Sequence, residues 1–275
     1  MDILQSIILA VVQGLTEFLP ISSSGHLALA DKLFGPGTAD LRFFAIVHFG
    51  TMFATIFVFW DEIAKLFKSL GTIPQAVREK KMNGELKMVL YIIIASIPTG
   101  FMGIFLKDKF ESLTQSAVIV GACLLVTGTI LLVTKFVRQS ERTENNFGFL
   151  RALVLGVAQG VAILPGVSRS GTTIATSLYL GAERKFAGRL SFLISLPAIL
   201  AVNLLEWFDP QAACPADGLL PKLPYIIGFV VAFGVGFLAL KLLLKIVESG
   251  KFWIFSFYCF AIGITAIVLG AMGII

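Results

Sequence analysis

The sequence predicts an all-α integral membrane protein with six transmembrane helices and two re-entrant helix–turn–helix pairs, arranged as an inverted-topology repeat. The membrane class follows from composition: 57% of the 275 residues are hydrophobic and 14% are charged, whereas roughly 25% of the residues of a soluble domain are charged. Long apolar runs between short charged loops indicate several crossings of a membrane. Two similar polar segments, at 13–27 and 159–173, indicate the repeat.

The two polar segments share one order of residue types. Each contains Gln-Gly, then Leu-Pro, then Ser-x-Ser-Gly, and a one-residue gap in each aligns Gln13 with Gln159 and Pro20 with Pro165. We expect both prolines to end the helices that precede them. Polar clusters at membrane depth are costly and mark functional sites by default, so we expect both segments to contribute to a site. The glycines expected to form tight turns and to allow close approach of a ligand are Gly14, Gly25, Gly160 and Gly171.

The first repeat half, 1–137, opens with an apolar helix at 3–19 that is too short for a full crossing, which takes about 20 residues. A second short helix at 22–34, capped by Ser22 or Ser23, returns the chain to the same side. Full spans are expected at 43–60, 88–106 and about 116–136, with a basic loop at 61–87.

The second half, 150–275, repeats this order after a polar loop at 138–146. Its re-entrant pair is expected near 150–164 and 170–181. Full spans are expected at about 186–206, 223–246 and 252–274. The two halves together are predicted to form one membrane domain, 1–275.

The distribution of Lys and Arg predicts the orientation. Fifteen of the 22 basic residues fall in loops on one side of the predicted spans, and five fall in loops on the other side. The first set of loops is 61–87, 135–151, 182–189 and 245–251; the second is 31–42, 107–115 and 207–222. The positive-inside rule places the first set in the cytoplasm. The N-terminus and the first re-entrant pair then lie on the outer side, the second pair enters from the cytoplasm, and the two pairs meet near the midplane.

The same charges argue against a soluble or nucleic-acid-binding protein. The net charge of +5 reflects the loop bias, because the basic residues form no continuous face, and we expect no nucleic-acid partner. The N-terminus lacks a basic region and an Ala-x-Ala site, so no cleavable signal peptide is expected. The predicted location is the cell membrane.

Arg169 is the strongest single candidate for chemistry. An arginine at membrane depth requires an anionic partner, and its guanidinium binds phosphate through two parallel hydrogen bonds. A helix that begins at Ser170 would add its free N–H groups. The alternative role is a structural ion pair with Glu17. The hydroxyls expected to assist phosphate binding are Ser22, Ser24, Ser168, Ser170, Thr172 and Thr173.

Glu17 and His26 are the other candidates. Glu17 is the only carboxylate inside a predicted re-entrant helix, and it could hold a divalent cation, activate water or neutralise Arg169. His26 follows three serines and a glycine, and it could transfer a proton or attack phosphorus. His48, on a full span without such neighbours, is the weaker candidate.

The first motif reads Gln13-Gly-x-x-Glu17-Phe-Leu-Pro-x-Ser-Ser-x-Gly-His26, and the second reads Leu164-Pro-Gly-x-Ser-Arg169-Ser-Gly-x-Thr173. Together they resemble the undecaprenyl-diphosphate phosphatase family, also called the bacitracin-resistance protein family. The resemblance runs along the whole chain, including its length and the order of its spans. Many members of that family carry Glu where this chain has Gln13, so a site with two carboxylates is in question here.

The resemblance implies an integral membrane hydrolase. Such an enzyme removes the terminal phosphate of a C55 isoprenyl diphosphate and yields the monophosphate carrier lipid for peptidoglycan and other wall polymers. The resemblance also implies dependence on a divalent cation and a site open to the outer face of the membrane. By motif match it assigns functional positions to Ser23, Glu17, His26, Ser168, Arg169 and Thr173.

The resulting hypothesis places Mg²⁺ or Ca²⁺ on Glu17, with the carbonyl oxygen of Gln13 as a further ligand. His26 acts as acid, base or nucleophile, and Ser23 or a metal-bound water is the other nucleophile. A lipid-phosphate flippase or transporter is the rival hypothesis, because inverted repeats with broken helices also build transporters. The scarcity of carboxylates at membrane depth favours the hydrolase. The metal, the preferred lipid length, transport of the product and the oligomeric state, with a homodimer as one option, stay open.

Overall fold

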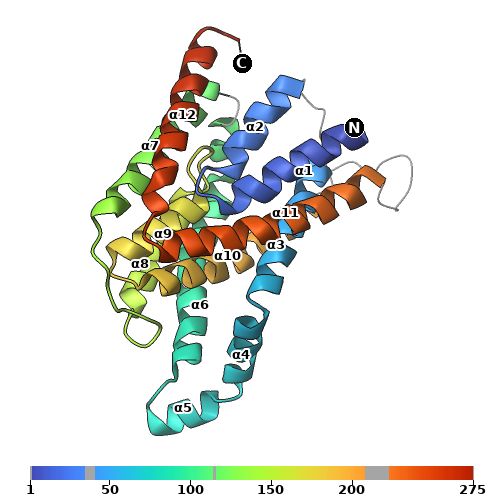
Figure 1. Cartoon of the computed structure of the whole chain (residues 1–275). Coiled ribbons are helices and arrows are strands. Elements are labelled where there is room, and N and C mark those ends of the chain that lie inside the picture. Colours follow the sequence, from blue (N-terminus) through green and yellow to red (C-terminus); the bar gives the residue numbers. More distant parts are fainter. Residues whose placement is uncertain (1, 35–40, 114–115, 208–222, 275) are drawn as a thin grey trace.

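The structure is a computed structural model that describes residues 2–34, 41–113, 116–207 and 223–274, and its regular structure is helical (Figure 1). The first half contains α1 (Ile3–Phe18), α2 (Ser23–Phe34), α3 (Leu41–Val58), α4 (Trp60–Leu70), α5 (Ile73–Glu79), α6 (Gly84–Leu113), α7 (Ala117–Val133) and the 3₁₀ turn η1 (Thr134–Phe136). The second half contains α8 (Phe149–Val161), α9 (Arg169–Tyr179), α10 (Arg184–Trp207), α11 (Leu223–Glu248), η2 (Phe252–Ile254) and α12 (Phe255–Ala271). Beyond Trp207, the predicted loop at 207–222 lies outside the described residues, as do the side chains of Lys32, Lys107 and Lys109.

The number of membrane spans agrees with the prediction. Within the described ranges, five helical segments are long and apolar enough to cross a membrane, and a sixth is counted if α3 and α4 form one broken span. α1 and α8 are apolar but shorter, as expected for the helices that open the two predicted re-entrant pairs. The five segments are Gly84–Leu106, Ala117–Phe136, Arg184–Leu205, Leu223–Glu248 and Phe252–Ala271.

The prediction of a basic loop at 61–87 is wrong, because this segment forms α4, α5 and the start of α6. Asp61 and Glu62 occupy the first turn of α4, where negative charge complements the helix dipole. Ile63 and Leu66 of the same helix pack against the hydrophobic core. A dense run of charges is typical of a loop, but the spacing of these charges leaves one apolar helical face.

The predicted helix breaks are present in both polar segments. α1 ends at Phe18, shortly before Pro20, and α8 ends at Val161, shortly before Pro165. Proline cannot continue a helix, since it lacks an N–H and its ring clashes with the preceding turn. The chain therefore turns at the same place in both segments.

Each pair restarts at a serine that accepts the same capping hydrogen bond. The hydroxyl oxygen of Ser22 accepts a hydrogen bond from the amide of Gly25 at 3.3 Å, and that of Ser168 accepts one from the amide of Gly171 at 3.1 Å. Ser23 and Arg169 thus occupy the same position, the first residue of their helices. α9 begins at Arg169, one residue before the expected start at Ser170.

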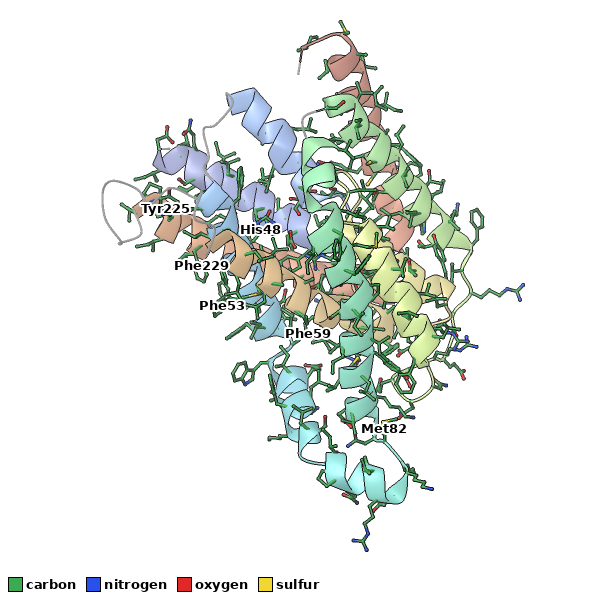
Figure 2. The ribbon with its side chains drawn as sticks, turned by 180° about the vertical axis from the view of Figure 1, so that it is seen from behind. His48, Phe53, Phe59, Met82, Tyr225 and Phe229 are labelled. Atoms are coloured by element: carbon green, nitrogen blue, oxygen red, sulfur yellow. The ribbon has the colours of Figure 1, made fainter. Side chains whose placement is uncertain are left out.

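The most extensive helix contacts join the two halves of the chain (Figure 1). α7 lies along α12, α11 packs against α1 and α3, and α6 packs against α8 and α10. One contact between α3 and α11 is the edge-on pair of Phe53 and Phe229, labelled in Figure 2, whose ring centroids are 5.8 Å apart. The large core is shared between the halves, so residues distant in sequence meet at its centre.

The four glycines expected to form tight turns lie inside helices instead. At Gly14 a Cβ would lie 2.9 Å from the Cβ of Val235 on α11, and at Gly160 it would overlap with the sulfur of Met102 on α6. These two glycines allow helices to approach closely. Gly25 and Gly171 lie in the first turns of α2 and α9, next to the capping serines. In the turns that precede α2 and α9, the residues with left-handed backbone are Ser22, with φ 68°, and Gly166, with φ 90°.

Gly156→Ala is expected to destabilise the contact between α8 and α6. The new Cβ would overlap with the carbonyl oxygen of Ala95, and such overpacking costs about 1–3 kcal/mol. The measurement is thermal unfolding of the purified protein in detergent. Gly100→Ala on α6 is the matched control, since nothing lies within 4 Å of its added Cβ. Equal unfolding temperatures for the two variants would contradict this packing.

Candidate active site

The turns of two helix pairs, α1 with α2 and α8 with α9, border one cavity of about 260 Å³. α1, α2 and α3 contribute part of its wall, and α6, α8, α9 and α10 contribute the rest. The lining residues are Thr16, Glu17, Ser22, Ser23, Ser24, His48, Thr99, Gln159, Ala162, Ile163, Val167, Ser168, Arg169, Ala198, Ile199, Val202 and Asn203. The two polar segments, far apart in sequence, therefore meet at one site.

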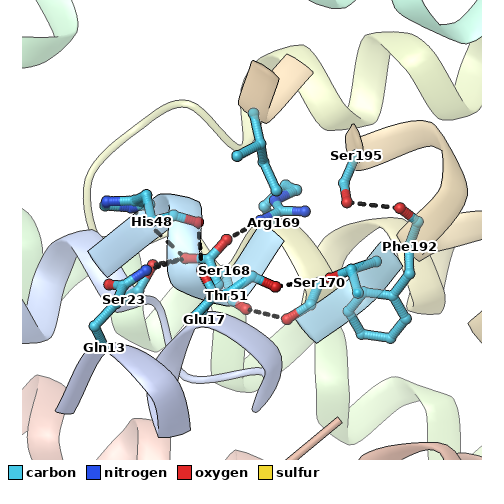
Figure 3. Close-up of polar contacts among 12 residues, drawn as sticks. Gln13, Glu17, Ser23, His48, Thr51, Ser168, Arg169, Ser170, Phe192 and Ser195 are labelled. Carbon is cyan, nitrogen blue, oxygen red and sulfur yellow. Dashed lines mark hydrogen bonds and ion pairs between the residues drawn. The ribbon is translucent and has the colours of Figure 1, made fainter. Parts of the chain in front are cut away.

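Glu17 is the centre of the polar contacts (Figure 3). Its carboxylate forms an ion pair with the guanidinium of Arg169, and only 4% of its side chain is exposed. The hydroxyl of Ser23 donates to its Oε2 at 2.7 Å, and the side-chain amide of Gln13 donates to the same oxygen at 3.1 Å. Nε2 of His48 lies 3.8 Å from Oε2 of Glu17. A buried carboxylate is stable only with such partners.

Two helix N-termini converge on this carboxylate. Ser23 is the first residue of α2, Arg169 is the first residue of α9, and both contact Glu17. The first N–H groups of a helix lack helical partners and carry partial positive charge. The cavity therefore combines a guanidinium, serine hydroxyls and two helix N-termini, which is a favourable environment for phosphate oxygens.

Hydrogen bonds from other elements hold the two turns together. The amide of Gly166 donates to the hydroxyl oxygen of Ser22 at 3.1 Å, which links the second turn to the first. The hydroxyl of Thr127, on α7, donates to the carbonyl of Gly166 at 3.0 Å and accepts from the amide of Ser168 at 3.0 Å. These contacts fix the left-handed backbone at Ser22, which is unusual for a residue other than glycine.

Some of the predicted phosphate-binding and catalytic residues line the cavity, and others do not. Ser22, Ser23, Ser24, Ser168 and Arg169 line the cavity together with Glu17. The remaining hydroxyl residues do not line it and are buried: Ser170, Thr172 and Thr173.

Thr173 has a supporting contact, because its hydroxyl donates to the carbonyl of Arg169 at 2.8 Å. Ser170 contacts the capping hydroxyl of Ser168, with the two oxygens 3.3 Å apart. Both residues therefore touch the first turn of α9 rather than the cavity.

His26 lies beside the cavity and is not among the described residues that line it. Its Nδ1 lies 2.8 Å from the carbonyl oxygen of Ser22, and its Nε2 lies 2.8 Å from the hydroxyl of Tyr258 on α12. The carbonyl can only accept, so Nδ1 carries a proton and Nε2 is the basic nitrogen of the neutral ring. His26 is on the same helix as Ser23, one turn further along.

Four polar residues that line the cavity have no site role predicted from the sequence: Thr16, Thr99, Gln159 and Asn203. His48, the weaker of the two histidine candidates, lines the cavity as well. All five lie within predicted apolar helices. A search for polar side chains inside such spans would have found them. The amide nitrogen of Gln159 donates to the hydroxyl of Thr99 at 3.1 Å, so these two residues form a neutral polar wall.

The donor set admits a divalent cation only with help from a ligand. No group of three or more His, Cys, Asp and Glu side chains gathers within the described ranges. Glu17 offers a carboxylate, and Oε1 of Gln13 is buried without a hydrogen-bond partner. Mg²⁺ commonly binds one or two protein carboxylates plus substrate phosphates. The residues therefore fit a cation that phosphate oxygens complete.

Comparison with known proteins identifies the family. The family model described as "Bacitracin resistance protein BacA" matches residues 6–265. The chain belongs to this family. The match covers nearly the whole sequence and includes both motifs, so the resemblance drawn from the motifs is confirmed.

Curated relatives named "Undecaprenyl-diphosphatase" are similar over their full length. The one from Desulforapulum autotrophicum is 42% identical over 280 residues, which cover 98% of this chain and 99% of the relative. The one from Methanosphaera stadtmanae is 39% identical over 99% of both chains. The one from Bacteroides fragilis is 39% identical over 99% of this chain and 100% of its own.

Proposed function

We propose that this chain is an undecaprenyl-diphosphatase, the activity for which its full-length relatives are named. It hydrolyses the lipid diphosphate to the lipid monophosphate and inorganic phosphate, and so supplies the carrier lipid for wall polymers. The observation that carries the proposal is the convergence of Glu17, Arg169 and two helix N-termini on one cavity. No feature of the described residues favours the flippase alternative.

Substrate binding adds a second anion, the phosphate, to the guanidinium of Arg169. The guanidinium pairs with Glu17 and still has N–H donors for a phosphate, since arginine carries five. The Ser23 and Ser168 hydroxyls and the first N–H groups of α2 and α9 complete the phosphate site. These groups stabilise the charge that develops on the phosphoryl oxygens as the bridging P–O bond breaks.

A divalent cation, when bound, stabilises negative charge on the diphosphate. Glu17 would hold it together with phosphate oxygens, and Oε1 of Gln13 is the available further donor. Gln13 also orients Glu17 through the amide hydrogen bond of 3.1 Å. Mg²⁺ or Ca²⁺ suits this oxygen-rich set.

Proton transfer is assigned to Nε2 of His26, because Nδ1 is committed to the Ser22 carbonyl. Transfer through Nε2 requires exchange of its Tyr258 partner for the substrate or water. The attacking oxygen comes from Ser23, which lines the cavity beside Glu17, or from water. A phosphoserine trapped during turnover and mapped to Ser23 would select the first route.

His26→Gln is expected to lower kcat by about 100-fold, the lower end of the usual contribution of a general acid or base. The comparison is His48→Gln, expected to lower kcat by less than about tenfold, since His48 Nε2 lies near Glu17 without a hydrogen bond to it. Steady-state phosphate release measures both variants. The opposite ranking would move the proton-transfer role to His48.

An inverted repeat is the arrangement we propose for the two halves. The proposed repeat makes four pairs of equivalent helices: α1 and α8, α3 and α10, α6 and α11, α7 and α12. If each helix is replaced by its equivalent, the contact of α1 with α11 becomes that of α8 with α6, and both contacts are present. In the same way the contact of α3 with α11 becomes that of α10 with α6, and the contact of α7 with α12 stays unchanged. The matching serine caps support the same exchange.

The proposed orientation places the N-terminus outside and opens the site to the outer face. Figure 1 shows α5 at the bottom and the segment between α7 and α8 at the lower left, whereas the N-terminus and the start of α11 lie at the upper right. The first two belong to the basic, cytoplasmic set of loops. The cavity is lined by residues 198–203 in the second half of α10, which leads away from that set.

The test is phosphate release by the purified chain in detergent micelles, where no gradient exists. We expect divalent-dependent release of phosphate from C55 and C15 diphosphates. A transporter without hydrolytic activity would release none.

Thiol labelling of a cysteine introduced at Gln75, on α5, tests the orientation, since only reagents that reach the cytoplasm should modify it.

A further inference from the structure

The segment from α4 to α5 projects from the bundle (Figure 1). It carries a row of exposed apolar side chains. Trp60 is 63% exposed, Phe67 is 70% exposed and Val77 is 72% exposed. Leu70 and Ile73 continue the row between the last two. Ile63 and Leu66 belong to the same apolar face of α4, since Ile63 lies three residues after Trp60 and four before Phe67, and both pack against the core. The core therefore covers one edge of this face, and Trp60 and Phe67 form the edge that stays exposed.

Basic side chains border this row. Those exposed on the two helices and just after them are Lys65, Lys68, Arg78, Lys80 and Lys81. The acidic residues of the same stretch are Asp61, Glu62 and Glu79, so the segment 60–81 carries five positive and three negative charges, a net +2. An amphipathic helix with aromatic residues and lysines is typical of helices that lie in a membrane interface.

The bend between α3 and α4 turns this segment away from the direction of α3. α3 is the apolar helix of the pair, and α4 is bent away from it by 74°. If α3 runs along the bilayer normal, the 74° bend leaves α4 close to the membrane plane. Trp60 stands at the bend, and tryptophan is enriched at the depth of the lipid headgroups.

We propose that the α4–α5 segment is a lipid-binding surface that lies on the membrane and recognises anionic headgroups. Trp60, Phe67 and Val77 insert among the outer parts of the acyl chains. Lys65 and Lys68 bind the phosphate groups of acidic phospholipids. The proposed orientation decides only which leaflet is contacted, and the surface itself does not depend on the proposed enzymatic activity.

The apolar part is tested with full-length protein in nanodiscs. The substitutions W207F and W253F leave Trp60 as the only tryptophan, because the chain contains three. We expect its fluorescence to be quenched by phospholipids brominated near the carbonyl end of the chain and to be shielded from aqueous iodide. Phe67→Trp combined with Trp60→Phe in this background should report the same depth. Quenching by iodide without quenching by bromolipid, at both positions, would overturn the proposal.

The charged part is tested by lipid selectivity. Spin-labelled phosphatidylglycerol is expected to associate more strongly than spin-labelled phosphatidylcholine with the wild-type chain. The double substitution K65Q/K68Q should lower this preference at least about fivefold, since each lysine near an anionic surface is worth about 1 kcal/mol. Gln75→Ala, at an exposed uncharged position of α5, is the control and should leave the preference unchanged. An unchanged preference in K65Q/K68Q would overturn the recognition of anionic headgroups.

Discussion

Arg169→Ala is expected to lower kcat/KM for hydrolysis of undecaprenyl diphosphate by about 1,000-fold, within the range for loss of an arginine that stabilises a phosphoryl transition state. The side chain supplies the only guanidinium among the described cavity-lining residues. Its loss also leaves the buried carboxylate of Glu17 without its ion-pair partner. Phosphate release from micellar substrate, measured over a range of substrate concentrations, gives the two kinetic constants.

Two further variants separate loss of the phosphate site from loss of charge. Arg169→Lys keeps the charge but not the two parallel hydrogen bonds, so we expect it to recover only a small part of the activity. Arg78→Ala, at an exposed position of α5 away from the cavity, should retain wild-type activity. Wild-type kinetics for Arg169→Ala would show that its ion pair with Glu17 is purely structural.

Glu17→Gln is expected to lower kcat by about 1,000-fold and to weaken divalent-cation binding in the presence of substrate. The amide keeps the shape of the side chain and one acceptor oxygen, which can still receive the hydrogen bond from Ser23. The fold should therefore survive while the negative charge that attracts the cation is lost. Activity is titrated with Mg²⁺ and Ca²⁺, and binding of Mn²⁺ is followed by its electron paramagnetic resonance signal.

Glu144→Gln is the matched control for this change. Glu144 also forms an ion pair with an arginine, Arg189, but neither residue lines the cavity. Loss of that pair should leave the kinetic constants and the cation dependence unchanged. Equal losses in the two variants would indicate that both carboxylates act through stability alone.

Much of the fold was predictable because each membrane span corresponds to one continuous apolar stretch of the sequence. A run of about 20 apolar residues suffices to predict a crossing, and a proline after a shorter run predicts a break. The segment 61–87 was mispredicted for the same reason. Its helices α4 and α5 are amphipathic, so their apolar residues are too sparse to register as a span.

The site was predictable where its residues are polar and clustered in sequence. Glu17, Ser23 and Arg169 stand in two polar motifs, and the structure brings them into contact. His48 and Asn203 are isolated on apolar helices, so their place in the cavity depends on the packing of α3 and α10. Likewise, nothing in the local sequence shows that Tyr258 meets His26, since 232 residues separate them.

The central claim is that one site built from both halves of the chain removes the terminal phosphate of a lipid diphosphate. The most direct measurement incubates the purified wild-type chain, Glu17→Gln and Arg169→Ala with undecaprenyl diphosphate, and quantifies both products. We predict equal amounts of inorganic phosphate and lipid monophosphate from the wild type, and loss of both products in each variant. Release of phosphate at the wild-type rate by either variant would contradict the claim.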